Sequence, residues 1–417
     1  MEENRVLLIT TRSADESDKR LFLKEREIRS LLNTLSVNVV FHQSFPLRQI
    51  NANTYIGKGQ AESLSPVIKY YEADEVVIDA FLSARQENNL ERIFGVPVND
   101  REGVILSIFF QNAHSKEARL QIEKAEREYL LPRLKNREAN FSQQRGGVRG
   151  AKGEGERQIE LSRRLLSSRI YSLEREIEKI KKIRRTQRKK REEEIFSFAL
   201  TGYTNAGKSS LLRALTGSPV LVEDKLFATL DTTTRKMRLP DGIDVLISDT
   251  VGFITNLPHR LIDAFSSTLE EALSASAIII VSDLSHPDAL ECFETTKRTL
   301  SELGADDKVA LHILNKTDAI YDDLAYYRLR NTGIKTVECS VKEMKGLDSV
   351  ISALSEIAEK EYASFVISVK NDGRLYSSLP SAAIVKAEYE GEYVKALIRV
   401  KKTLEESVKK IIEKIKA

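Results

Sequence analysis

The sequence predicts a multidomain α/β protein with parallel sheets, a helical hairpin and a small α+β tail. Short apolar runs alternate with helical patterns near the start of the chain and again after residue 195, as in parallel sheets with crossover helices. Between these regions, two long charged stretches repeat apolar residues at helical spacing. We therefore expect domain boundaries that give residues 1–114, 115–194, 195–360 and 361–417.

Composition sets broad limits on the protein. The 417 residues are 41% hydrophobic and 30% charged, with a formal net charge of only +3, so total charge indicates no partner. Cys292 and Cys339 lack metal-ligand spacing, and we expect two buried thiols in a reducing compartment. The first residues do not form a signal peptide, and no apolar run approaches the roughly 18 residues of a membrane span. A cytoplasmic protein is expected.

Residues 1–114 are predicted to form a small parallel α/β domain. Apolar runs at 6–9, 37–40, 76–79 and 96–98 have helical patterns between and after them. A Gly-x-Gly turn within Tyr55–Gln60 stands at a helix start. Such a turn either binds an anion or only begins the helix, and this short motif does not distinguish the two.

Residues 115–194 are predicted to form an antiparallel helical hairpin, with helices at about 115–136 and 158–194. The segment 145–157 between them is rich in glycine and arginine, and we expect a flexible, exposed, basic loop. The second helix ends in a run of cations without an acidic residue: Lys179, Lys181, Lys182, Arg184, Arg185, Arg188, Lys189, Lys190 and Arg191. A charge run is often only a solvated surface. Two basic segments on one hairpin favour contact with the backbone of structured RNA.

A phosphate-binding loop follows the first strand of the third region. Residues 202–209 read Gly-Tyr-Thr-Asn-Ala-Gly-Lys-Ser between an apolar run and a helical pattern. The glycines let main-chain N–H groups face phosphate oxygens, and the helix start attracts the same anion. Lys208 adds charge for the β- and γ-phosphates and is a predicted catalytic residue, while the Ser209 hydroxyl can bind Mg²⁺. The predicted phosphate-binding residues are Gly202, Tyr203, Thr204, Asn205, Ala206, Gly207, Lys208, Ser209 and Ser210.

Two further segments could respond to a γ-phosphate. The stretch 226–235 is rich in threonine, and Thr229, Thr232, Thr233 and Thr234 are all able to close onto Mg²⁺, although a threonine-rich strand is an alternative. The stretch Asp249, Thr250, Val251 and Gly252 ends an apolar strand. Asp249 can hold a Mg²⁺-bound water, and the N–H of Gly252 can reach the γ-phosphate because no side chain blocks its approach. Gly252 is therefore another predicted catalytic residue.

The motif Asn315-Lys316-Thr317-Asp318 predicts which base is bound. The Asp318 carboxylate can accept hydrogen bonds from guanine N1–H and its exocyclic amine, whereas adenine lacks those donors. Asn315 can bond the O6/N7 side of the base, and the stem of Lys316 can cover the ring. A later loop with Ser340, Val341 and Lys342 can lend a backbone N–H to guanine O6. In this order, the motifs predict GTP and GDP binding.

Phe253 stands where many signalling GTPases have a glutamine that orients the attacking water. Phenylalanine cannot hydrogen-bond to water. We therefore expect hydrolysis without a partner at the roughly 10⁻⁴–10⁻² s⁻¹ of unassisted enzymes, with a partner supplying the missing effect.

Residues 361–417 are expected to form a small α+β domain with strands at 364–369, 383–389 and 393–400. The last helix has one apolar face, from Leu404 to Ile415, which packs in a core or, alternatively, lies on a membrane surface.

The sequence resembles the HflX family of translation-associated GTPases over most of its length. The resemblance rests on the turn 55–59, on Gly153–Glu160 with Arg157 at a usual threonine, on Phe227–Asp231 with Thr232 at a usual proline, on Asp249–Ile254, and on Ala264–Glu271. It implies that Thr229 is the catalytic Mg²⁺ ligand beside Ser209, with Asp249 acting through water. It also adds nucleotide contacts at Phe227, Ala228, Thr229, Leu230 and Asp231.

The same resemblance implies binding to the large ribosomal subunit, with the basic hairpin reaching rRNA, in ribosome splitting, rescue or biogenesis. A different class of function is a nucleotide-gated switch that recruits a protein or membrane partner with little hydrolysis. A P-loop small-molecule kinase is disfavoured by Asp318 and its neighbours. We expect a Mg²⁺-dependent GTPase that is a monomer in the cytoplasm, with the membrane periphery as a second location.

Overall fold

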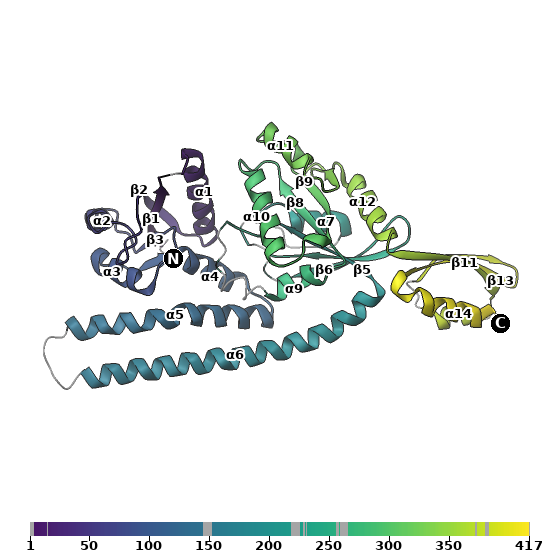
Figure 1. Ribbon diagram of the computed structural model, residues 1–417, viewed down its shortest axis with the longest axis horizontal. Coiled ribbons are helices and arrows are strands. Elements are labelled where there is room, and N and C mark those ends of the chain that lie inside the picture. Colours follow the sequence, from purple (N-terminus) through teal and green to yellow (C-terminus); the bar gives the residue numbers. More distant parts are fainter. Residues whose placement is uncertain are drawn as a thin grey trace. The chain divides into compact units, whose positions relative to one another are not determined.

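The computed structural model describes residues 4–14, 16–144, 152–217, 226–227, 230, 232–255, 258, 266–371, 373–379 and 383–416. Contacts within the chain divide it into two compact units (Figure 1). Unit 1 holds residues 1–180, 225–227 and 258–265, and unit 2 holds residues 181–224, 228–257 and 266–417. The predicted α/β class with parallel sheets is confirmed. The finer division into four domains stays a proposal.

Unit 1 begins with a parallel sheet of four strands in the order β2-β1-β3-β4. Leu7, Ile9, Val76 and Ile78 are fully buried in its core, which explains the apolar runs in the sequence. The elements are β1 (Arg5–Ser13), α1 (Asp18–Thr34), β2 (Asn38–Leu47), α2 (Lys58–Tyr70), β3 (Glu75–Ile78), α3 (Ala84–Phe94), β4 (Val98–Asp100) and α4 (Arg101–Asn112).

The Gly-x-Gly turn begins helix α2. Gly57 is the N-cap residue, and its N–H donates to Oε1 of Gln60 at 2.8 Å. The Gln60 side chain therefore satisfies a donor at the helix start, as in a capping box. The turn is therefore explained by its role in starting helix α2. Anion binding there stays a prediction.

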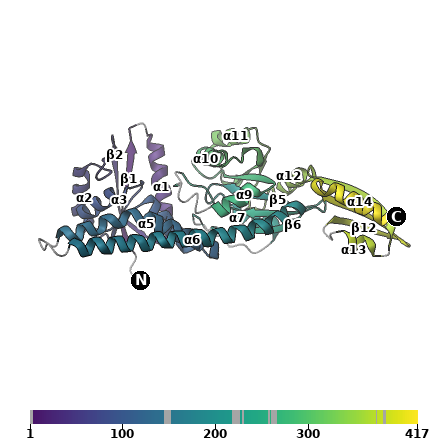
Figure 2. The same cartoon turned by 60° about the horizontal axis from the view of Figure 1, so that its bottom comes forward.

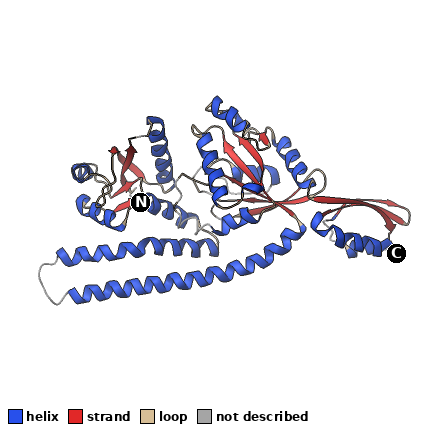
Figure 3. Cartoon of the chain, in the orientation of Figure 1, coloured by secondary structure: helices blue, strands red, loops and turns tan. Residues whose placement is uncertain are grey.

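Two long antiparallel helices follow, α5 (Lys116–Gln144) and α6 (Lys152–Glu194), drawn side by side in Figures 1 and 3. Leu120 packs with Leu173 and Ile177, and Arg169 donates to both carboxylate oxygens of Glu123 at 2.9 Å. These contacts join the base of the predicted hairpin.

The prediction of a flexible loop over residues 145–157 is wrong for residues 152–157. Residues 145–151 lie outside the described part of the chain, but 152–157 form the first turns of α6. Inside a helix, glycine lowers stability by about 1 kcal/mol relative to alanine. For this reason Gly153 and Gly155 favoured a loop. In the first turn the N–H groups lack helical partners in any case, and a helix of 43 residues extends through them.

A buried ion cluster fixes α5 to the sheet of unit 1. Arg133 donates to Glu87 at 2.5 Å and to Asp100 at 3.1 Å, and its guanidinium lies 3.4 Å from the ring centre of Tyr129. All of these side chains are buried. Removing Arg133 would leave the two buried carboxylates without this cation, so the cluster holds α5 on the domain.

Unit 2 is built on a sheet of six strands in the order β10-β9-β8-β5-β7-β6, in which only the edge strand β6 is antiparallel. Its elements up to residue 359 are β5 (Phe196–Gly202), α7 (Lys208–Thr216), β6 (Thr233–Arg238), β7 (Asp244–Asp249), α9 (Ser266–Ser274), β8 (Ala277–Asp283), α10 (Ala289–Glu302), η1 (Asp306–Lys308), β9 (Val309–Asn315), η2 (Thr317–Ala319), α11 (Asp323–Arg330), β10 (Thr336–Glu338) and α12 (Leu347–Glu359). The parallel strands β5, β7, β8 and β9 all end at one edge, where the predicted nucleotide motifs begin.

The tail is an antiparallel sheet in the order β11-β13-β12 with α14 packed beside it (Figures 1 and 2). Its elements are β11 (Tyr362–Lys370), α13 (Arg374–Ser378), β12 (Ile384–Glu390), β13 (Tyr393–Lys401), η4 (Lys402–Leu404) and α14 (Glu405–Lys416). Val408, Ile412 and Ile415 on α14 are buried against this sheet. The apolar face of the last helix therefore belongs to a protein core.

The two cysteines differ in their burial. Cys339 is buried, but Cys292 is only partly buried, so the expectation of two buried thiols is wrong for Cys292. Cys292 lies on α10 and lines a small cavity, which gives its sulfur some access to solvent.

Among the residues that the structure describes, no helix combines the length and the apolar character that a membrane crossing needs.

Candidate nucleotide-binding site

The phosphate-binding loop joins β5 to α7, as the motif predicts. Gly207 caps α7 with a left-handed backbone (φ 90°), and a Cβ on it would lie 2.3 Å from Nδ2 of Asn315. Only glycine fits this conformation without strain and leaves room for Asn315. Asn205 also has positive φ (60°), which asparagine tolerates better than most residues. The backbone thus turns sharply before the helix start, where N–H groups are available to an anion.

Lys208 is the buried cation of this loop. Its Nζ donates to the carbonyls of Gly202 at 3.1 Å and Tyr203 at 2.8 Å, and only 6% of the residue is exposed. Burial lowers the pKa of Lys208 to about 8, and the nearby Asp249 partly opposes this shift. A phosphate would supply the negative charge that the buried ammonium lacks.

Ser209 and Asp249 form an oxygen pair suited to a hard cation. The Ser209 hydroxyl donates to Oδ2 of Asp249 at 2.6 Å, at the end of β7, and Asp249 is fully buried. A hydroxyl and a carboxylate are ligand types that Mg²⁺ prefers. The residues therefore fit the predicted ion, with Ser209 as a direct ligand and Asp249 acting through water.

The side chain of Asn315 links the end of β9 to the phosphate-binding loop and to the loop after β10. Its Nδ2 donates to the carbonyl of Ala206 at 3.0 Å, and its Oδ1 accepts the N–H of Val341 at 3.3 Å. The thiol of Cys339 donates to the same oxygen at 3.6 Å. Both ends of the amide are thus engaged with the protein. The sequence motif predicts a contact of Asn315 with the base and gives no sign of this linking role.

Asp318 is held in place by the later loop. The Ser340 hydroxyl donates to Oδ1 of Asp318 at 2.5 Å, and this bond lowers the pKa of that carboxyl. The N–H groups of Ser340 and Val341 are bonded to Lys345 and Asn315. Lys342 lies 3.9 Å from the Asp318 carboxylate. The structure therefore brings the two predicted base-binding segments together and keeps Asp318 ionised.

Asp283 is a site residue that the sequence analysis missed. It ends β8, and its Oδ2 is 2.6 Å from Nζ of Lys316, which has a left-handed backbone (φ 63°). The ion pair fixes the stem of Lys316, the group predicted to cover the base. The position of Asp283 at the carboxyl end of a parallel strand was the available signal, since ligands bind at that edge.

The threonine-rich segment is only partly described. Ala228, Thr229 and Asp231 lie outside the described residues, while Leu230 is buried. Thr233 and Thr234 belong to β6, so the strand alternative holds for them. Phe227 belongs to unit 1, where its carbonyl accepts from Asn112 at 3.0 Å and its ring meets the ring of Phe109.

The segment after β7 lies directly on the phosphate-binding loop. A Cβ on Gly252 would be 2.6 Å from Cα of Thr204, so this contact requires glycine. Thr250 donates to the carbonyl of Leu200 at 2.8 Å. Val251 and Phe253 are buried. Phe253 therefore presents no polar group to an attacking water and is turned into the protein.

Family models match three consecutive regions. Residues 24–110 match "GTP-binding GTPase N-terminal", residues 112–191 match "GTP-binding GTPase Middle Region", and residues 197–316 match "50S ribosome-binding GTPase".

The chain is also similar to individual proteins. The chain is 39% identical to "GTPase HflX" of Akkermansia muciniphila over 390 residues, covering 90% of this chain and 89% of that protein. It is 38% identical to "GTPase HflX" of Lacrimispora saccharolytica, covering 95% and 94%. A solved GTP-binding protein of Sulfolobus solfataricus in complex with GDP is 25% identical, covers 86% of this chain and 99% of its own, and has a TM-score of 0.45.

Proposed function

The chain belongs to the HflX family of GTPases and hydrolyses GTP, and from this premise we propose that it acts on the large ribosomal subunit. The family description "50S ribosome-binding GTPase" supports this partner. The observation that carries the proposal is the run of cations at 179–191 on α6, which contains no acidic residue. A strongly basic helix end attracts a phosphate backbone, and structured RNA is the densest source of such charge on a ribosome.

The hairpin suits this task mechanically. The Arg133 cluster fixes α5 to the first sheet, and the contacts of Leu120 and Glu123 hold α6 on α5. Lys179 and Lys182 are exposed on α6. A rigid helix carrying exposed cations can contact RNA backbone and shape without reading bases. We propose that the protein binds in this mode in the cytoplasm, in ribosome splitting, rescue or biogenesis.

We further propose that Mg²⁺ binds at Ser209, Thr229 and, through water, Asp249. When bound, the ion neutralises charge on the β- and γ-phosphate oxygens. In this proposal Lys208 adds a second positive charge, and the N–H of Gly252 donates to the γ-phosphate. Because Phe253 is buried and apolar, hydrolysis by the free protein is slow and a group or constraint from the subunit accelerates it.

GTP turnover and co-sedimentation with purified large subunits test the proposal together. We expect turnover to rise about 100-fold with subunits, the effect of one well-placed transition-state donor. Replacing Arg188, Lys189, Lys190 and Arg191 by glutamine should remove most of this rise. Binding should weaken with salt, and the variant's slope of log affinity against log salt should be shallower by up to about four.

A matched control removes the same charge elsewhere. Lys402, Lys409, Lys410 and Lys414 belong to the last residues of the chain, and their replacement by glutamine should leave subunit binding unchanged. Equal losses in the two variants would mean that net charge alone matters. Equal turnover with and without subunits would favour the other class of function, a nucleotide-gated switch with a protein or membrane partner.

A further inference from the structure

The segment after β7 is bound to the phosphate-binding loop by a short parallel bridge between Tyr203 and Phe253. The N–H of Thr204 donates to the carbonyl of Phe253 at 2.8 Å, and the N–H of Phe253 donates to the carbonyl of Gly202 at 3.0 Å. These bonds extend the pairing of β5 and β7 beyond the strand ends, into the phosphate-binding loop and the segment after β7.

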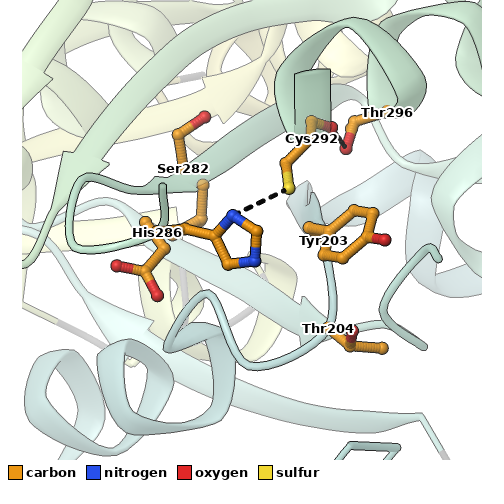
Figure 4. A pocket seen from close by; sticks show the side chains of 8 residues that line it. Tyr203, Thr204, Ser282, His286, Cys292 and Thr296 are labelled. Atoms are coloured by element: carbon orange, nitrogen blue, oxygen red, sulfur yellow. Dashed lines mark hydrogen bonds between the residues drawn. The ribbon is translucent and has the colours of Figure 1, made fainter. Parts of the chain in front are cut away.

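The hydroxyl of Tyr203 adds a side-chain contact to this bridge. It accepts the N–H of Thr255 at 2.9 Å and lies 2.8 Å from the Thr255 hydroxyl. The tyrosine ring lines a small cavity with His286 and Cys292, and its hydroxyl points away from His286 (Figure 4). The ring is therefore held by its neighbours while the hydroxyl reaches the other loop.

The bridge determines where Gly252 lies. Gly252 is the residue just before Phe253, and it packs so closely on Thr204 that a side chain would collide with that residue's main chain. Since Phe253 offers no hydrogen-bonding side chain, this segment acts on the γ-phosphate through main-chain groups. A main-chain donor helps hydrolysis most when it is already in position, because no free energy is then spent on ordering it during the reaction.

We propose that the Tyr203 hydroxyl is a positioning group for GTP hydrolysis. It holds Thr255, and through Thr255 the bridge at Phe253, so that the Gly252 peptide stays against the phosphate-binding loop. In this role the hydroxyl acts through Thr255 and not on the nucleotide directly.

Single-turnover GTP hydrolysis of the full chain tests this role in Tyr203→Phe, Thr255→Val and the double variant. Tyr203→Phe removes both contacts to Thr255 and should slow GTP hydrolysis about ten-fold, whereas Thr255→Val removes only the contact between the hydroxyls and should slow it about three-fold. The double variant should be no slower than Tyr203→Phe, because Thr255→Val breaks a contact that Tyr203→Phe already breaks. GDP affinity should stay within about two-fold of the parent in all three, since the phosphate-binding loop is intact.

Tyr362→Phe is a matched control. The Tyr362 hydroxyl also accepts a main-chain N–H, from Phe196 at the opposite end of β5, at 3.1 Å. Its removal should lower the melting temperature and leave the hydrolysis rate unchanged. Amide exchange at Phe253 should quicken in Tyr203→Phe and not in Tyr362→Phe.

Other outcomes would overturn the proposal. Unchanged hydrolysis in both single variants would make the contact purely structural, and faster hydrolysis would make it a restraint. Multiplicative slowing in the double variant would show that the two hydroxyls act separately. A parallel loss of GDP affinity would show damage to the nucleotide pocket. If Tyr203→Phe does not fold, Thr255→Val keeps the tyrosine ring and the main-chain bond, and unchanged hydrolysis in it would overturn the role of the hydroxyl contact.

Discussion

The phosphate end and the base end of the candidate site are organised by different parts of the chain. At the phosphate end, a loop contiguous in sequence supplies main-chain groups, one buried ammonium and one hydroxyl, all within residues 202–210. At the base end, side chains from β8, from the segment just after β9 and from the Ser340 loop hold one another through Asp283–Lys316 and Ser340–Asp318 contacts. Triphosphate binding at the candidate site therefore depends on local conformation, whereas base selection depends on side chains brought together by the fold.

The two ends meet at one place. Asn315 donates to the carbonyl of Ala206, and Gly207 leaves the space that Asn315 occupies. Changes confined to one end should therefore alter one property, and a change at this junction should alter both.

The largest effect is expected at the phosphate end from Lys208→Ala. Two charge-assisted hydrogen bonds to phosphate would be lost, and at about 1.5–3 kcal/mol each this weakens GTP and GDP about 1,000-fold. The preference for guanine over adenine should survive in the residual binding. Calorimetry measures both, with the exposed Lys360→Ala as the control that keeps full affinity. A loss below ten-fold would contradict the assigned role.

Asp318→Asn should break the base end alone. The carboxylate that accepts two guanine donors becomes an amide, and GTP binding should weaken about 100-fold. Xanthine nucleotide should then bind better than guanine nucleotide, because xanthine presents an acceptor where guanine has a donor. Competition against a fluorescent nucleotide measures the order of these two affinities. Asp323→Asn, on the exposed start of α11, should change nothing. An unchanged guanine preference in Asp318→Asn would refute the base assignment.

Gly207→Ala should disturb the junction and so both ends. A methyl group would strain the left-handed backbone by about 1 kcal/mol and would displace Asn315, so we expect about ten-fold weaker GTP and GDP with a reduced guanine preference. Gly217→Ala is the control at the other end of α7. Gly217 has similar positive φ (64°), but nothing lies within 4 Å of a Cβ there. If both variants lost the same affinity, backbone strain alone would be responsible.

The smallest effect is the pH dependence of the phosphate end. The pKa of Lys208 is lowered to about 8 in the free protein, and bound phosphate raises it. In the free protein Lys208 is therefore mostly charged at pH 7, about half charged at pH 8 and mostly neutral at pH 8.5, and GDP affinity should fall about four-fold between pH 7 and 8.5. Lys208→Arg stays charged across this range and should give a flat profile. A flat profile in the parent protein would show that Lys208 keeps its proton.

The sequence could predict those parts of the protein whose residues are near one another along the chain. The glycine spacing at 202–207 and the apolar strands around it identified the phosphate loop, and the 4-and-3 spacing of apolar residues identified the hairpin helices. Predictions from the sequence were wrong where the surrounding structure outweighed the preference of a single residue. Glycines suggested a loop at 152–157 although the residues belong to α6, and Cys292 was expected to be fully buried.

By itself the sequence determined the family, the α/β class and the order of the nucleotide motifs, because each motif is a short contiguous pattern with its own backbone requirement. Only the tertiary structure decided which side chains support those motifs. Tyr203 meets Thr255, Lys316 meets Asp283 and Asn315 meets Ala206 across 52, 33 and 109 residues of chain. Such contacts depend on strand order and register, and no local pattern of residues encodes them.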